Sequence, residues 1–137
     1  MSDHSQHKFN WQKGFAKRFI PGIAWFFIVL YLMTIPGKEL PEVGWLDKIY
    51  FDKWVHAGLF AVMVFLFCWP FNRSSFIKPE RYNYFIRIAI ASCLWGLTIE
   101  FIQKFFIPGR SFDLWDWAAD SIGVLMGYVV SRRYFSV

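Results

Sequence analysis

Residues 84–130 read YFIRIAIASCLWGLTIEFIQKFFIPGRSFDLWDWAADSIGVLMGYVV. Two apolar segments, 84–106 and 114–130, flank a connection that contains Pro108 and Gly109, and both of these residues disfavour a continuous helix. An α-helix rises about 1.5 Å per residue, so about 20 residues cross the hydrocarbon core of a bilayer. The stretch therefore predicts two transmembrane helices joined by a tight turn.

Two further apolar segments, 19–35 and 54–71, precede this pair. The chain is 56% hydrophobic, 23% aromatic and only 18% charged, whereas soluble domains are about 25% charged. These features predict an all-α membrane protein. Its single domain, residues 19–137, is expected to be a bundle of four transmembrane helices that follows a tail of residues 1–18. The first segment ends in Thr34-Ile35-Pro36-Gly37 without a small-residue cleavage site, so we interpret it as a membrane anchor and not as a signal peptide.

The distribution of basic residues predicts the orientation. If the segments alternate from a cytoplasmic N-terminus, ten of the 15 Lys and Arg lie on the inner side and five on the outer side. The positive-inside rule then places both termini in the cytoplasm. The net charge of +5 comes without a soluble basic face or a recognition motif, so we expect no nucleic-acid partner. The first outer loop, residues 36–53, is expected to carry a short interfacial segment rich in aromatic residues around Trp45–Phe51.

Acidic residues gather on the predicted outer side. Eight of the ten Asp and Glu fall there: Glu39, Glu42, Asp47, Asp52, Glu100, Asp113, Asp116 and Asp120. Ionisable groups within or close to membrane spans are costly, and they commonly mark functional sites. We therefore expect the function of the protein to lie at this outer end.

Helical periodicity predicts which way the acids face. At about 100° per residue, Glu100 and Gln103 share a face of the third segment, and Asp116 and Asp120 share a face of the fourth. The same faces carry small residues: Ala89, Ser92 and Gly96 on the third segment and Ala119, Gly123 and Gly127 on the fourth. Small residues allow membrane helices to approach closely. The polar side chains are therefore expected to face the bundle interior between the third and fourth segments.

These residues suggest an outward-facing polar pocket. We predict His56, Glu100 and Asp116 as general acids or bases, because carboxyl and imidazole groups move protons readily. The predicted substrate-binding residues are Asp52, Lys53, Gln103, Arg110, Asp113 and Asp120. Lys53 and Arg110 would hold an anionic phosphate or carboxylate.

Two other interpretations use the same residues. In a structural one, Arg110 neutralises Asp113 or Asp116, and His56 bonds Glu100, so that the network only locks the helices together. In a metal-binding one, a divalent ion is held by His56, Glu100, Asp116 and Asp120. The sequence contains no HExxH motif, and it leaves the cofactor undetermined.

The spaced motifs resemble the VanZ-like family of small bacterial membrane proteins. They read Asp52-Lys53-x-x-His56, then Glu100-x-x-Gln103, then Pro108-Gly109-Arg110-Ser111-x-Asp113-x-x-Asp116-x-x-x-Asp120-x-x-Gly123-x-x-x-Gly127. The sequence departs from the family pattern at two positions: Phe60, where Tyr is frequent, and Asp120, where Asn is common. The first substitution removes a hydroxyl, and the second adds an ionisable group to the predicted site.

The resemblance implies a multi-pass protein of the bacterial cytoplasmic (inner) membrane that acts in the cell envelope. The family namesake is associated with low-level resistance to teicoplanin, a glycopeptide that binds cell-wall precursors. We therefore expect the protein to contact membrane lipids and its pocket to bind or modify a lipid-linked or cell-wall precursor. Such an activity would affect glycopeptide susceptibility. Two alternatives remain: a non-catalytic structural or accessory subunit that binds a protein partner, and a small proton- or ion-coupled carrier with Glu100, Asp120 and His56 as its relay.

Overall fold

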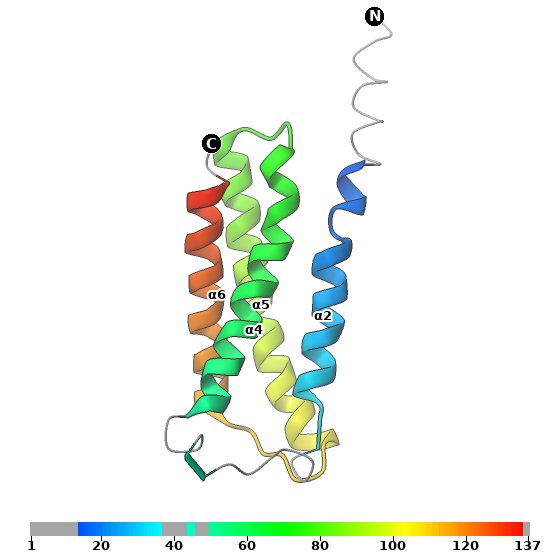
Figure 1. Cartoon of the computed structure of the whole chain (residues 1–137), viewed down its shortest axis with the longest axis vertical. Coiled ribbons are helices and arrows are strands. Elements are labelled where there is room, and N and C mark those ends of the chain that lie inside the picture. The colour runs from blue at the N-terminus through cyan, green and yellow to red at the C-terminus, as the bar shows by residue number, and fades with distance from the viewer. Residues whose placement is uncertain (1–13, 37–43, 46–49, 136–137) are drawn as a thin grey trace, which may run out of the picture.

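A computed structural model describes residues 14–36, 44–45 and 50–135 (Figure 1). Its main helices are α2 (Ile20–Met33), α4 (Phe51–Cys68), α5 (Lys78–Phe106) and α6 (Leu114–Tyr134), and a 3₁₀ helix, η2 (Trp69–Arg73), continues α4. The described ranges contain no strand, so the predicted all-α fold is confirmed. The expected N-terminal tail up to residue 13 and most of the expected interfacial segment lie outside the described residues.

Within the described residues, three helical stretches are long and apolar enough to cross a membrane: Gly14–Met33, Phe51–Arg73 and Lys78–Phe106. The fourth predicted span, α6, has 21 residues, which is long enough, but Asp116 and Asp120 lower its hydropathy. Both carboxylates are buried inside the bundle. The outer surface is apolar instead, with Leu94 and Ile122 60% and 57% exposed. Apolar surface of this kind suits contact with lipid, and the protein is a membrane protein.

Helix α5 begins earlier than the sequence predicts. The apolar segment that predicts this helix begins at residue 84, but α5 starts at Lys78. Pro79 lies in its first turn, where a missing N–H costs nothing. The Ile77 N–H donates to Glu80 Oε2 at 3.3 Å, which satisfies a free amide at the helix end. The helix therefore begins before the apolar segment, and the residues added at its N-terminal end are polar.

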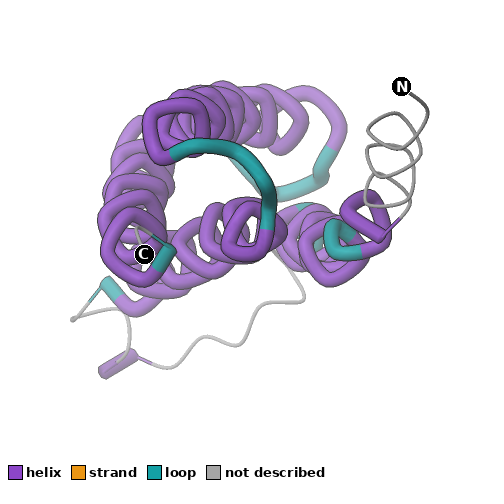
Figure 2. The backbone as a smooth tube through the Cα atoms, turned by 90° about the horizontal axis from the view of Figure 1, so that it is seen from above, coloured by secondary structure: helices purple, strands orange, loops and turns teal. Residues whose placement is uncertain are grey.

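Helices α4, α5 and α6 lie side by side, and α2 lies beside them against α4 (Figure 2). The most extensive contact joins α4 to α6. A Cβ atom added at Gly127 would lie 2.5 Å from the carbonyl oxygen of Ala61, and one at Gly123 would overlap the carbonyl of Ala57. The prediction that these glycines face the third segment is therefore wrong, because they allow α6 to pack on α4.

Two side-chain hydrogen bonds attach α2 to the other helices. The indole N–H of Trp25 donates to the Leu59 carbonyl oxygen on α4 at 3.0 Å. Gln103 Nε2 on α5 donates to the Met33 carbonyl oxygen at 2.8 Å. The second bond satisfies one of the carbonyls that the end of a helix leaves unpaired.

Candidate functional site

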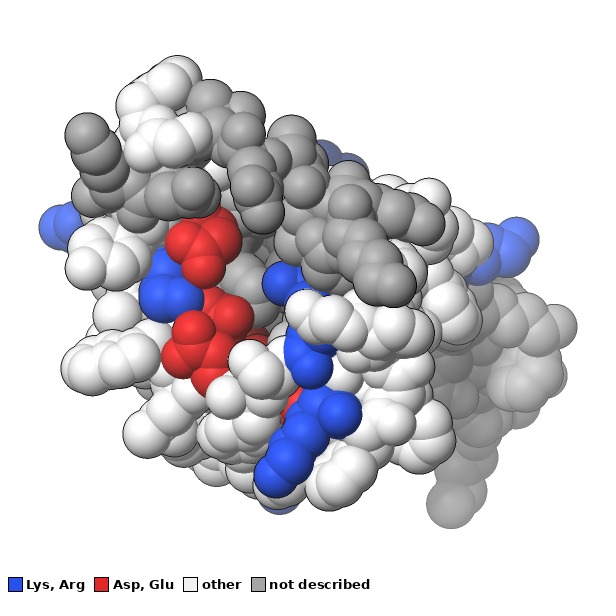
Figure 3. Space-filling model, turned by 90° about the horizontal axis from the view of Figure 1, so that it is seen from below, with Lys and Arg blue, Asp and Glu red and all other residues white. Residues whose placement is uncertain are grey.

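The candidate site lies at the end of the bundle where α4 and α6 begin and α5 ends, opposite the start of α2 and the end of α6 (Figure 1). Seen from this end, carboxylates gather beside Lys and Arg side chains (Figure 3). Gly109 has φ 76° and permits the turn between α5 and α6. Asp113 then caps α6, because its Oδ1 accepts the Trp115 N–H at 2.8 Å. The turn and the cap together bring Asp113 and Asp116 close to α4.

Lys53 is the main cation of the site. Its Nζ lies 3.0 Å from Asp52 Oδ2, 3.1 Å from Asp113 Oδ2 and 2.6 Å from Asp116 Oδ1. An ammonium group has three donors, so these three carboxylates occupy all of them. The structural alternative in which Arg110 neutralises Asp113 or Asp116 is therefore wrong, since Lys53 binds both carboxylates.

Asp113 is held in its ionised form. Burial opposes ionisation, but the Trp115 N–H and the Lys53 ammonium outweigh it, so the pKa of Asp113 lies below its usual range. The backbone N–H of Asp113 also donates to Glu100 Oε2 at 2.9 Å. This residue therefore joins the Lys53 ion pairs to the deeper part of the site.

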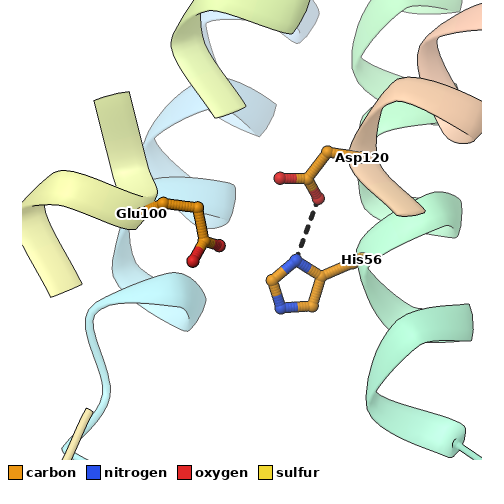
Figure 4. A group of neighbouring side chains, drawn as sticks. All are labelled: His56, Glu100 and Asp120. Atoms are coloured by element: carbon orange, nitrogen blue, oxygen red, sulfur yellow. Dashed lines mark hydrogen bonds and ion pairs between the residues drawn. The ribbon is translucent and has the colours of Figure 1, made fainter. Parts of the chain in front are cut away.

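The deeper part consists of His56, Glu100 and Asp120, which project from α4, α5 and α6 toward one another (Figure 4). His56 Nδ1 lies 2.9 Å from Asp120 Oδ1, and His56 Nε2 lies 4.0 Å from Asp116 Oδ2. The structural alternative in which His56 bonds Glu100 is therefore wrong. Glu100 and Asp120 are both 0% exposed. Within the described structure, Glu100 Oε1 and Asp120 Oδ2 have no hydrogen-bond partner.

Two residues that sequence reasoning did not assign to the site form its inner wall. A Cβ atom at Gly96 would lie 2.9 Å from Asp120 Oδ2, so the glycine makes room for this carboxylate. The Phe60 ring lies against the same position and is fully buried. The sequence did indicate that Gly96 lies on the same helix face as Glu100. It could not show that the Asp120 carboxylate of α6 would face this glycine.

Two predicted binding residues lie apart from the cluster. Gln103 is buried toward α2, where it bonds the Met33 carbonyl. Arg110 is half-buried in the turn, and it forms no ion pair with any carboxylate of the described ranges. Its Nε is buried and has no partner among the described residues. The structure therefore brings together Asp52, Lys53, His56, Glu100, Asp113, Asp116 and Asp120.

The described cavities lie elsewhere on the molecule. One of about 310 Å³ is an apolar groove between α5 and α6, lined in part by Cys93, Leu94 and Leu125. A second, of about 180 Å³, is lined by Phe26 of α2, Met63 of α4 and Trp95 of α5, among others. The polar cluster itself is closely packed between its three helices, with His56, Glu100, Asp116 and Asp120 all buried.

The arrangement offers two kinds of chemistry. The pair of His56 and Asp120 can exchange a proton, with Glu100 adjacent. The same three residues can each offer one metal-ligand atom, and these atoms all lie within 4.8 Å of one another. Asp116, the fourth predicted ligand, is engaged by Lys53 instead.

The fold and the cluster define a small helical membrane protein with buried ionisable side chains at one end of its bundle. The chain belongs to the VanZ/LLP1 family, whose family model matches residues 4–135. The VanZ-like resemblance of the sequence motifs is thus confirmed. Comparison with curated proteins and with solved structures found no match.

Proposed function

We propose that this VanZ-like protein spans the bacterial cytoplasmic membrane and uses an outward-facing polar site to bind a lipid-linked or cell-wall precursor. The distribution of Lys and Arg supports cytoplasmic termini. The polar cluster lies at the end of the bundle opposite the first turn of α2 and the last turn of α6 (Figure 1). With cytoplasmic termini, the cluster therefore faces outward.

The observation that carries the proposal is the buried and incompletely bonded pair of Glu100 and Asp120. Each has one carboxylate oxygen without a hydrogen-bond partner among the described residues. A carboxylate inside a membrane costs about 2.5–3.5 kcal/mol on insertion scales, and apolar residues would join the helices without this cost. A ligand that donates hydrogen bonds to these oxygens would offset the cost of burying the two carboxylates.

The side chains indicate the chemistry of this ligand. Carboxylates accept hydrogen bonds, so they suit hydroxyl groups of sugars and amino groups of peptides. Arg110, half-buried in the turn between α5 and α6 and without an ion pair in the described chain, suits a phosphate that it can bind through two parallel hydrogen bonds. A precursor that carries sugar, peptide and pyrophosphate on a lipid tail offers all of these groups.

Modification of the bound precursor is a second candidate function of the same site. The 2.9 Å contact of His56 with Asp120 favours it, because a carboxylate beside an imidazole supports general acid–base chemistry. The carrier alternative has less support. From the cluster toward the opposite end of the bundle the described core is mainly apolar, with Phe60, Met63 and Val64 fully or almost fully buried. Its buried polar residues there are Ser92, Ser131 and Arg81, and none of them is a carboxylate or a histidine. A relay for protons or ions requires polar groups along its path.

Binding can be tested with the full chain in lipid nanodiscs and a polyprenyl-pyrophosphoryl disaccharide-pentapeptide as ligand. We expect saturable binding that Arg110→Lys and Glu100→Gln each weaken by about tenfold, since lysine loses the planar fork and glutamine loses the charge. Lys78→Gln, at the opposite end of the bundle, serves as the control and should bind like the parent. Equal binding by all variants would contradict the proposed site.

Two further ligands identify what is recognised. Polyprenyl pyrophosphate without sugar or peptide should bind more weakly, because it offers the carboxylates no donors. Phosphatidylglycerol should not compete at all. Competition by phosphatidylglycerol at the same concentration would show that the site binds anionic lipids in general, and it would overturn the proposal. In cells, deletion should alter glycopeptide susceptibility, and the parent gene but not Glu100→Gln should restore it.

A further inference from the structure

The deeper part of the polar cluster holds more acidic than basic side chains among the described residues. Lys53 uses its three donors on Asp52, Asp113 and Asp116. Glu100 and Asp120 lie near His56 instead, and Asp120 contacts it directly. Two ionised carboxylates beside one imidazole would carry excess negative charge in a region of low dielectric, which is unfavourable unless a proton or a cation balances it.

Each of these carboxylates has one oxygen that is free to bind a cation. Glu100 Oε1 and Asp120 Oδ2 are buried and without a hydrogen-bond partner in the described part of the chain. The side chains of Glu100, Asp120 and His56 converge from three different helices (Figure 4). A metal ion bound there would complete the coordination of oxygens that the protein itself leaves unsatisfied.

The distances fit a small divalent ion. Such ions hold nitrogen and oxygen ligands at about 2.0–2.2 Å, which places neighbouring ligand atoms about 3 Å apart in octahedral coordination and about 3.4 Å apart in tetrahedral coordination. His56 Nδ1 and Asp120 Oδ1 are 2.9 Å apart, and each of the three residues has one possible ligand atom within 4.8 Å of those of the other two. Small side-chain rotations therefore bring the three groups into coordinating positions.

We propose that His56, Glu100 and Asp120 form a binding site for one divalent transition-metal ion. An imidazole nitrogen favours zinc and related first-row ions over Mg²⁺ and Ca²⁺, which prefer oxygen ligands alone. Three protein ligands leave coordination positions open for water or for a ligand oxygen, as in catalytic zinc sites. The inference stands on the geometry of these side chains and does not depend on the proposed precursor binding.

The test uses the metal alone, with Zn²⁺ for stoichiometry and Co²⁺ as a spectroscopic probe. The full chain carries two other histidines, His4 and His7, that could bind zinc weakly. The experiment is therefore done in a His4→Asn, His7→Asn background, with an affinity tag that lacks histidine. After chelation and removal of the chelator, isothermal titration in detergent should give one Zn²⁺ per chain, and Co²⁺ should produce a visible absorption band that Zn²⁺ abolishes.

Three variants and a matched control assign the ligands. His56→Gln, Glu100→Gln and Asp120→Asn should each weaken Zn²⁺ binding by more than about tenfold. Glu80→Gln removes an exposed carboxylate at the opposite end of the bundle and keeps an oxygen that can accept the Ile77 N–H, so it should leave binding unchanged. Glu100→Asp keeps the charge but withdraws the oxygen by one methylene, so it should fold and still bind more weakly.

Metal binding by the parent protein decides the question even if a variant does not fold. Absence of zinc binding and of the Co²⁺ band in the folded parent would overturn it, because protons alone would then balance the carboxylates. Undiminished binding by folded Glu100→Gln and Asp120→Asn would also overturn it, by placing the metal elsewhere. Mg²⁺ at a hundredfold excess should not displace Co²⁺, and displacement would contradict the proposed imidazole ligand.

Discussion

Lys53 and Asp116 join α4 to α6 through an ion pair with 2.6 Å between Nζ and Oδ1. Both side chains are largely shielded from solvent, at 24% and 10% exposed. The pair lies about one helical turn nearer the start of α4 and α6 than the buried contact between His56 and Asp120, which joins the same two helices. One helix interface is therefore held by two successive charged contacts, and their roles can be separated by substitution.

Removal of Lys53 should destabilise the bundle. Lys53→Met leaves Asp116 with an uncompensated, mostly buried charge, and we expect a loss of about 2 kcal/mol, below the range for fully buried pairs because Lys53 is partly exposed. The double variant Lys53→Met, Asp116→Asn should recover most of this loss. Thermal unfolding in detergent, followed by tryptophan fluorescence, measures the effect. Lys78→Met is the control, and equal melting temperatures for the two lysine variants would contradict a structural role of Lys53.

The glycines of α6 should be intolerant of a methyl group. In Gly127→Ala the added Cβ would lie 2.5 Å from the Ala61 carbonyl oxygen, so α6 must move away from α4. Overpacking of this kind costs about 1–3 kcal/mol, which exceeds the gain in helix propensity of about 1 kcal/mol. The melting temperature should therefore fall, and Gly123→Ala should behave in the same way.

Gly58→Ala is the matched control for these glycine variants. Gly58 lies on α4, and a Cβ added there meets no atom within 4 Å. Its substitution should leave the protein unchanged or slightly stabilise it, since alanine favours the helix. A similar loss of stability at Gly58 and Gly127 would mean that close helix contact is not the cause.

Asp113 should make stability depend on acid pH. Its pKa is lower in the folded protein than in the unfolded chain, so the folded state holds fewer protons there. Its ionised form then stabilises the protein above the ordinary Asp pKa of about 3.9, and this contribution disappears as pH falls below that value. Asp113→Asn keeps a good helix cap but removes the charge.

The comparison of Asp113→Asn with the parent isolates this charge. The parent should be the more stable protein at pH 7, and the difference in melting temperature should shrink as the pH falls from about 5 to about 2, because the pKa of Asp113 in the folded protein lies below its ordinary value. The measurement uses a maltoside detergent, whose head group does not titrate. A difference that stays constant over this range would contradict the assignment.

The predicted orientation can be tested by labelling introduced cysteines in intact cells. Ser111, in the turn before α6, and Ser75, between η2 and α5, are both exposed and lie at opposite ends of the bundle. In a background of Cys68→Ala and Cys93→Ala, an impermeant maleimide should label Ser111→Cys and not Ser75→Cys. Both sites should react after permeabilisation. Labelling of Ser75→Cys alone before permeabilisation would place the candidate site in the cytoplasm.

The phase of each helix could be predicted from the sequence. Glu100 and Gln103 on α5, and Asp116 and Asp120 on α6, are all buried as the periodicity predicts. This works because a helix fixes the angle between its own residues, whatever surrounds it. The polar first turn of α5 could not be predicted in this way, since hydropathy marks the apolar part of a helix and not its end.

The sequence by itself determined that the chain would form apolar helices with their acids on inward faces. Only the tertiary structure decided which group meets which: Lys53 and not Arg110 binds Asp116, and His56 contacts Asp120 and not Glu100. The glycines of α6 likewise approach α4 and not α5. The physical reason is that helical phase gives the face of one helix, whereas partners depend on the position and rotation of the neighbouring helices, which the packing of all of them sets together.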